Sequence, residues 1–193
     1  MAGAQARHAA SLPHSLTTFV GRERDIQICS ELVRRGEVRL LTLVGAGGVG
    51  KTRLAIEIAE NLTGDFDEVA YVSLAHLRDP MLVPDAVAAA FGFQLVGDRP
   101  MTDIAVTFLD DRRALLVIDS VEGVVEAAPW VATLLAHCRT LTILATSRVR
   151  LAVYGEQVYP VAPLMLPDLS VPSHLLAESD AVRLLDGDLL DLE

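Results

Sequence analysis

The stretch Gly45-Ala46-Gly47-Gly48-Val49-Gly50-Lys51-Thr52 decides the fold of this chain. It matches the pattern G-x-x-x-x-G-K-[ST], whose glycines let the backbone wrap with its N–H groups pointing inward. An apolar run at 38–44 precedes it and a helical pattern at 53–62 follows it, which is the strand–loop–helix context that the pattern requires. The helix adds a partial positive charge at its N-terminus. The sequence therefore predicts a loop that binds phosphate groups.

The residues of this loop have separate expected roles. Lys51 can reach the β- and γ-phosphates of a nucleotide, and the hydroxyl of Thr52 is suited to Mg²⁺. We therefore expect ATP or ADP, together with Mg²⁺, as the ligand of the loop. The other candidate contacts to the nucleotide are Gly45, Ala46, Gly47, Gly48, Val49, Gly50 and Arg53.

Apolar runs alternate with helical patterns along the rest of the chain. Strands are expected at 38–44, 69–74, 114–118, 141–145 and 157–159. Helices are expected at 23–35, 53–62, 81–91, 101–109, 124–137 and 173–185. Continuous apolar strands that alternate with helices favour a parallel sheet covered on both faces. The predicted fold class is α/β: a P-loop NTPase with a mostly parallel five-stranded sheet and helices on both faces.

A carboxylate follows the fully apolar strand expected at 114–118. Asp119 should lie at the carboxyl edge of the sheet, where ligands of open α/β sheets bind. We expect it to hold Mg²⁺ through water, with Thr52 as the second metal-binding residue. Glu122 lies three positions further on and is a candidate to orient or polarise the attacking water. The alternative interpretation of Glu122 is a solvated loop acid.

The triplet Thr146-Ser147-Arg148 ends the next expected strand, so it should lie beside the phosphate loop and Asp119. A guanidinium there can sense the γ-phosphate, because a terminal phosphate offers charge-assisted hydrogen bonds that ADP lacks. The alternative is a solvated arginine that opens a loop. We assign Arg148 to the catalytic set with Lys51, Asp119 and Glu122.

The segment Phe19-Val20-Gly21-Arg22-Glu23-Arg24-Asp25 resembles the hhGRExE signature of STAND-class ATPases, with Asp25 in the final acidic position. Taken with the phosphate loop, it makes the chain similar to the NB-ARC-like nucleotide-binding domain of bacterial LuxR-type and SARP-type transcription regulators. The resemblance covers roughly residues 12–185. The other segments that carry it are 115–119, 143–148 and 155–164.

This resemblance implies an ATP/ADP switch with slow Mg-dependent ATP hydrolysis, taken from a signal-transducing transcription regulator. It also implies that Val20, Gly21 and Arg22 contact the adenine and ribose. The alternative is that Gly21 and Arg22 only begin a helix.

One departure from the family concerns catalysis. Asp119 is followed by Ser120, where the family usually has Asn or a second Asp, and a serine cannot act as a general base as a carboxylate does. A non-hydrolysing ADP-binding interaction module, or a truncated remnant of a regulator, is therefore the alternative function. A GTPase or a nucleotide kinase would also carry the loop, but the sequence holds no Asn-Lys-x-Asp element and no clear acceptor site.

The expected domain organisation has three parts. Residues 1–18 are predicted to be a flexible lead-in, 19–165 the nucleotide-binding domain, and 166–193 the truncated start of a helical domain with an acidic tail. The missing remainder of that helical domain should weaken nucleotide affinity, because part of the ligand stays exposed.

Composition bounds the partners of this chain. The formal net charge of −10 argues against a nucleic-acid-binding face, so we expect no direct DNA contact from this chain. The sequence has no signal-peptide pattern and no apolar run long enough to span a bilayer, so we expect a cytoplasmic protein with no membrane partner. Besides the nucleotide, two kinds of partner are candidates: a second copy of this chain, or another protein that binds the acidic tail.

Overall fold

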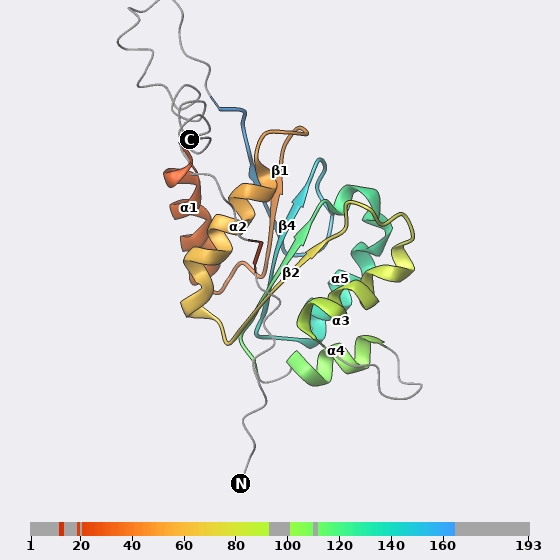
Figure 1. Ribbon diagram of the computed structural model, residues 1–193. Coiled ribbons are helices and arrows are strands. Elements are labelled where there is room, and N and C mark those ends of the chain that lie inside the picture. Colours follow the sequence, from red (N-terminus) through yellow and green to blue (C-terminus); the bar gives the residue numbers. More distant parts are fainter. Residues whose placement is uncertain (1–11, 14–18, 20, 93–100, 110–111, 165–193) are drawn as a thin grey trace, which may run out of the picture.

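Five strands form one sheet in the order β2-β3-β4-β1-β5, and each neighbouring pair is parallel (Figure 1). The computed structural model describes residues 12–13, 19, 21–92, 101–109 and 112–164. The strands are β1 (Leu40–Val44), β2 (Glu68–Ser73), β3 (Ala114–Asp119), β4 (Leu141–Ser147) and β5 (Glu156–Pro160). The fold class predicted from the sequence is thus confirmed.

Helices cover both faces of this sheet. Figure 1 shows α1 and α2 on one side and α3, α4 and α5 on the other. Their bounds are α1 (Glu23–Arg34), α2 (Lys51–Leu62), α3 (Val83–Phe91), α4 (Met101–Leu109) and α5 (Ala128–His137). Short 3-10 turns lie at Thr63–Asp65, Pro80–Leu82, Val121–Gly123 and Val125–Ala127. No helix in the described ranges is both long enough and apolar enough to cross a membrane.

Strand β3 shows why the central strands are apolar on both sides. Leu115 and Val117 are buried in the core under α1 and α2, whereas Leu116 and Ile118 are buried in the core under α3, α4 and α5. Successive side chains of a strand point to opposite faces, so a strand with a helix layer on each face needs a continuous apolar run.

Strand β4 lies between β1 and β3, and this order builds the site. The register pairs Leu43 of β1 with Thr146, and Ile118 of β3 with Ala145. Parallel strands end at the same edge of the sheet, so the beginning of the phosphate loop, the end of β4 and Asp119 lie side by side. This is the placement that the sequence predicted for residues 146–148.

Two of the expected helices begin with 3-10 turns. The helix expected at 124–137 begins as 3-10 turns and becomes α-helical at Ala128, and the one expected at 81–91 becomes α-helical at Val83. In both, a proline occupies the first turn, where its missing N–H costs nothing. The expected helix at 173–185, the acidic tail and most of the lead-in lie outside the described residues.

Candidate functional site

The phosphate loop joins β1 to α2 with backbone conformations that favour glycine. Gly48 and Gly50 have positive φ angles of 79° and 88°, and Gly50 is the N-cap of α2. At the start of the loop, a Cβ on Gly45 would lie 2.6 Å from the carbonyl oxygen of Val161. The loop therefore packs directly against the segment that leaves β5. The loop leads into the positive end of a 12-residue helix, where anions bind.

Lys51, the first residue of α2, is held inside this loop. Its Nζ donates to the carbonyl oxygen of Ala46 at 2.8 Å, and the side chain is only 9% exposed. The ammonium group thus lies within the curve of the loop, close to where the loop would enclose a phosphate.

Asp119 receives two short hydrogen bonds on one carboxylate oxygen. Thr52 Oγ1 and Thr146 Oγ1 each donate to its Oδ1 at 2.6 Å. The other oxygen, Oδ2, accepts from the hydroxyls of Tyr71 and Ser120, each at 3.4 Å. Asp119 is 5% exposed, so hydroxyl donors from two strands, one helix and the turn after β3 surround a buried negative charge. Burial and the charge of Asp119 raise the pKa of the Tyr71 phenol, which keeps it a donor.

The oxygen atoms at this point fit Mg²⁺. Thr52 gives its hydrogen to Asp119, so the lone pairs of its hydroxyl remain for a cation. Mg²⁺ is usually bound through one or two protein oxygens plus phosphates and water. Across the described ranges no group of three or more His, Cys, Asp or Glu side chains gathers that could hold a metal ion.

Ser120 makes the sharp turn that follows β3. Its φ of 62° and ψ of 51° lie in the left-handed region, which residues other than glycine rarely adopt. Its N–H donates to Thr146 Oγ1 at 2.9 Å. The turn buries Val121 and brings Glu122 back toward the end of β4.

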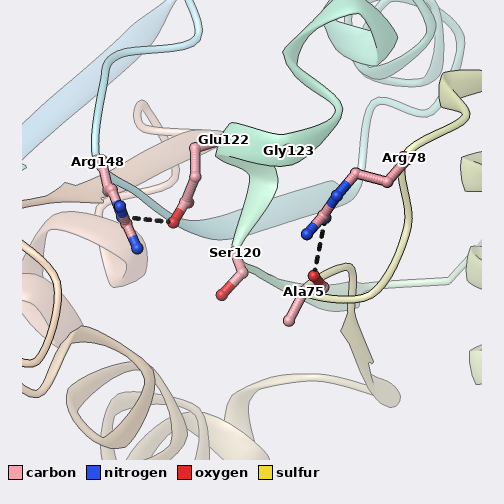
Figure 2. Close-up of a pocket in the computed structure, with 6 residues that line it drawn as sticks. All are labelled: Ala75, Arg78, Ser120, Glu122, Gly123 and Arg148. Carbon is pink, nitrogen blue, oxygen red and sulfur yellow. Dashed lines mark hydrogen bonds and ion pairs between the residues drawn. The ribbon is translucent and has the colours of Figure 1, made fainter.

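Glu122 and Arg148 meet beside the phosphate loop, as Figure 2 shows. Arg148 Nε lies 3.2 Å from Glu122 Oε1, while Glu122 Oε2 is buried and has no hydrogen-bond partner within the described ranges. The guanidinium also reaches the loop, because a Cβ on Gly47 would lie 3.5 Å from Arg148 Nη2. Arg148 is 66% exposed, so it can move.

These two residues line a pocket of about 310 Å³ next to Asp119. The other lining residues are Ala75, Arg78, Ser120 and Gly123. Arg78 lies across Ser120 from Arg148 (Figure 2), and its Nη1 donates to the carbonyl oxygens of Ala75 and Leu77 at 3.0 and 2.9 Å. Two guanidinium groups therefore flank the pocket in a chain whose net charge is negative.

The buried side chain of Arg22 binds other groups of the protein. Its Nη1 pairs with Asp25 at 3.0 Å, and its Nη2 donates to the carbonyl oxygens of Val49 and Ala162 at 3.2 and 2.6 Å. The side chain is 8% exposed. Asp25 in turn accepts a hydrogen bond of 2.5 Å from Tyr159 of β5. Arg22 thus joins the N-terminal signature to the phosphate loop and to the segment after β5.

The remaining candidates for base contacts lie near this junction. Gly21 precedes α1 with a φ of 81°, and Val20 lies outside the described residues. Arg53 lies 5.6 Å from the ring centroid of Phe19 and pairs with Glu57 at 2.8 Å, so it connects the signature to α2. Contact of these residues with a base stays a prediction.

Sequence reasoning missed two members of the site and the hydrogen-bonding role of a third. Tyr71 and Arg78 were not identified, and Thr146 was included only as part of the triplet that ends β4. The strand register that brings Tyr71 and Thr146 to Asp119 depends on the order of the strands. The strand ends in the sequence place residues 146–148 beside Asp119, but no local pattern pairs the hydroxyls of Tyr71 and Thr146 with its carboxylate.

Comparison with known proteins places these residues in a family. A family model described as NB-ARC domain matches residues 23–162. A putative HTH-type transcriptional regulator of Mycobacterium tuberculosis is 40% identical over 134 residues, which cover 69% of this chain and 15% of that protein. The regulatory protein AfsR of Streptomyces coelicolor is 28% identical over 159 residues, which cover 74% of this chain and 16% of that protein. The chain thus spans about one sixth of the length of each of these relatives.

Two solved structures share the fold. Cdc6p from Pyrobaculum aerophilum has a TM-score of 0.62 at 13% identity, over 83% of this chain and 50% of that one. A signal transduction ATPase with numerous domains (STAND) and a tetratricopeptide repeat sensor, from Pyrococcus horikoshii, has a TM-score of 0.55 at 17% identity. It covers 92% of this chain and 29% of that one. At these identities the likeness concerns the fold alone.

Proposed function

This chain belongs to the NB-ARC domain family, and from that premise we propose that it binds ATP and ADP with Mg²⁺ and acts as a switch between the two. Hydrolysis of ATP would be slow and would reset the switch. The two nucleotides differ only in the γ-phosphate, so the residues that respond to that group decide which state the domain is in.

The observation that carries this proposal is the hydrogen bond of 2.6 Å between Thr52 and Asp119. It joins the end of the phosphate loop to the end of β3 and leaves the lone pairs of the Thr52 hydroxyl for Mg²⁺. Lys51 lies next to Thr52, and its amine would exchange the carbonyl of Ala46 for a phosphate oxygen. When bound, Mg²⁺ would neutralise charge on the β- and γ-phosphates.

Hydrolysis needs a group that orients or polarises the attacking water, and Glu122 is the candidate. Asp119 is assigned to Mg²⁺ and accepts from Thr52 and Thr146 on one oxygen, and the hydroxyl of Ser120 is no general base. In the structure, Glu122 is paired with Arg148 and its second oxygen is buried. The carboxylate would have to leave Arg148 before both of its oxygens could face water, which supports a slow reaction.

The same ion pair favours the alternative function, in which the domain holds ADP and does not turn over. A Glu122 that never leaves Arg148 would give nucleotide binding without hydrolysis. In either case the sensor role proposed for Arg148 requires that its guanidinium reach the γ-phosphate.

The proposal extends to the longer proteins in which such domains occur. Two of the relatives are named as regulators, and we assign this chain the nucleotide-dependent switching step of such a protein. Self-association or a protein partner would carry the signal onward. The negative net charge supports the expectation that this chain makes no direct contact with DNA.

Single-turnover release of phosphate from Mg-ATP separates the two functions. The wild-type chain should release phosphate slowly but above the baseline of Asp119→Asn, which loses the carboxylate charge. Asp85→Asn, an exposed acid on α3, is the matched control and should behave as wild type. Tight binding of ATP with no release above the Asp119→Asn baseline would favour the non-hydrolysing module.

A further inference from the structure

The hydroxyl of Thr146 lies at the centre of the hydrogen bonds around Asp119. It is 1% exposed, accepts from the N–H of Ser120 at 2.9 Å and donates to Asp119 Oδ1 at 2.6 Å. A hydroxyl has one hydrogen, so the hydrogen of Thr146 is committed to the carboxylate. Strand β4 therefore holds both the carboxylate at the end of β3 and the turn that follows it.

This arrangement makes the two oxygens of Asp119 unequal. Oδ1 takes short bonds from both Thr146 and Thr52, whereas Oδ2 has two hydroxyls at 3.4 Å, beyond the usual range of about 2.5–3.0 Å for O–H···O bonds. Oδ2 thus keeps acceptor capacity while Oδ1 is saturated. The plane of the carboxylate is set by donors on two different elements.

We infer that Thr146 is a positioning residue for the magnesium site: it holds Asp119 by Oδ1 and leaves Oδ2 available, where it would accept a hydrogen bond from the water around bound Mg²⁺. The inference rests on the proposed function, because it requires that nucleotide bind with Mg²⁺. Thr146, whose hydroxyl is committed to Ser120 and Asp119, would itself contact neither metal nor nucleotide. Partners that orient a metal-binding carboxylate typically change metal affinity about 10- to 100-fold when removed.

The test compares nucleotide affinity with and without the metal. ATP is titrated into the wild-type chain and into Thr146→Val, once with saturating Mg²⁺ and once with EDTA. Thr146→Val keeps the shape of the side chain and removes the hydroxyl. It should lower the enhancement of ATP affinity by Mg²⁺ about tenfold or more and leave the affinity in EDTA unchanged.

Two further variants control for folding and for the loss of any buried hydroxyl. Thr142→Val lies on the same strand, is also buried, and should keep the wild-type enhancement. Thr146→Ser keeps the hydroxyl that orients Asp119, so its enhancement of ATP affinity by Mg²⁺ should stay within about twofold of the wild-type value. A folded Thr146→Ser chain that loses the enhancement overturns the inference even if Thr146→Val does not fold.

The outcomes separate this inference from the function on which it rests. Equal loss of affinity with Mg²⁺ and with EDTA in Thr146→Val would mean a structural role alone and would overturn the inference. A wild-type chain whose ATP affinity does not respond to Mg²⁺ would overturn the magnesium site itself. A loss confined to the Mg²⁺ condition supports both.

Discussion

The guanidinium of Arg148 pairs with the carboxylate of Glu122 at 3.2 Å while it lies against Gly47 of the phosphate loop. Arg148 is therefore within reach of both Glu122, the residue proposed to act on the attacking water, and the expected position of the γ-phosphate. If the Arg148 guanidinium pairs with the γ-phosphate, it would move away from Glu122. Binding of ATP would then release Glu122, whereas ADP would leave the pair in place.

Removing the charge of Glu122 should favour ATP over ADP. In Glu122→Gln the ion pair is lost and Arg148 is available to the γ-phosphate. Exposed ion pairs contribute about 0.2–1 kcal/mol, so ATP affinity should rise up to about fivefold with ADP affinity unchanged. Competition titrations of both nucleotides measure this, with Glu126→Gln, an exposed acid on the next turn, as the control. An equal change for ATP and ADP would refute the exchange of partners.

Gly45 should tolerate no side chain. A Cβ there would lie 2.6 Å from the backbone oxygen of Val161, so Gly45→Ala should lower the free energy of unfolding by about 1–3 kcal/mol. Gly64→Ala is the matched control, because a Cβ at Gly64 meets nothing within 4 Å, and it should change stability by less than about 0.5 kcal/mol. Urea unfolding measures both. Similar values for the two variants would contradict the close packing of the loop on residue 161.

Ser120 should be replaceable by asparagine with a gain in stability. Asparagine tolerates the left-handed conformation better than serine does, so Ser120→Asn should raise the free energy of unfolding by a few tenths to about 1 kcal/mol. A β-branched residue is strained there, and Ser120→Val should lose about 1–2 kcal/mol. Thermal unfolding ranks the three chains. A Val variant as stable as wild type would show that the turn does not have this conformation.

Arg22 should not be replaceable by lysine. A single ammonium cannot span Asp25 and the carbonyls of Val49 and Ala162, so Arg22→Lys leaves buried acceptors unpaired. We expect a loss of about 1.5–3 kcal/mol in the free energy of unfolding. The neighbouring exposed Arg24→Lys is the control and should be neutral. A neutral Arg22→Lys would mean that these three contacts do not hold the domain together.

Stability should fall in alkaline solution. Burial, with the charge of Asp25, raises the pKa of the Cys29 thiol from 9.0 to about 12, and burial with the hydrogen bond to Asp25 raises the pKa of Tyr159. Both groups keep their protons to a higher pH in the folded state than in the unfolded state. Their contribution to the free energy of unfolding is therefore complete below about pH 9. It decreases as the pH rises, by up to about 1.4 kcal/mol per pH unit for each group. Urea unfolding between pH 8 and pH 11 should show this decrease, and Tyr159→Phe should reduce it. A free energy of unfolding that does not change between pH 8 and pH 11 would argue against the burial of the Cys29 thiol and of the Tyr159 phenol.

The phosphate loop and Asp119 could be predicted from the sequence because their chemistry needs a fixed spacing or a fixed strand end. The loop must offer glycines followed by Lys51 and Thr52, and Asp119 must follow an apolar strand. Tertiary contacts of single side chains have no such signature. The partners of Arg22 come from residues 27 and 140 positions away, and those of Thr146 depend on β4 lying between β1 and β3.

Direct titration of Mg-ATP and Mg-ADP into the wild-type chain and Lys51→Ala tests the central claim most directly. Lys51 is the residue whose amine lies within the loop, so both nucleotides should bind the wild-type chain and lose most of their affinity in the variant. A folded wild-type chain that binds neither nucleotide, or a Lys51→Ala chain that binds both as well as wild type, would contradict the account.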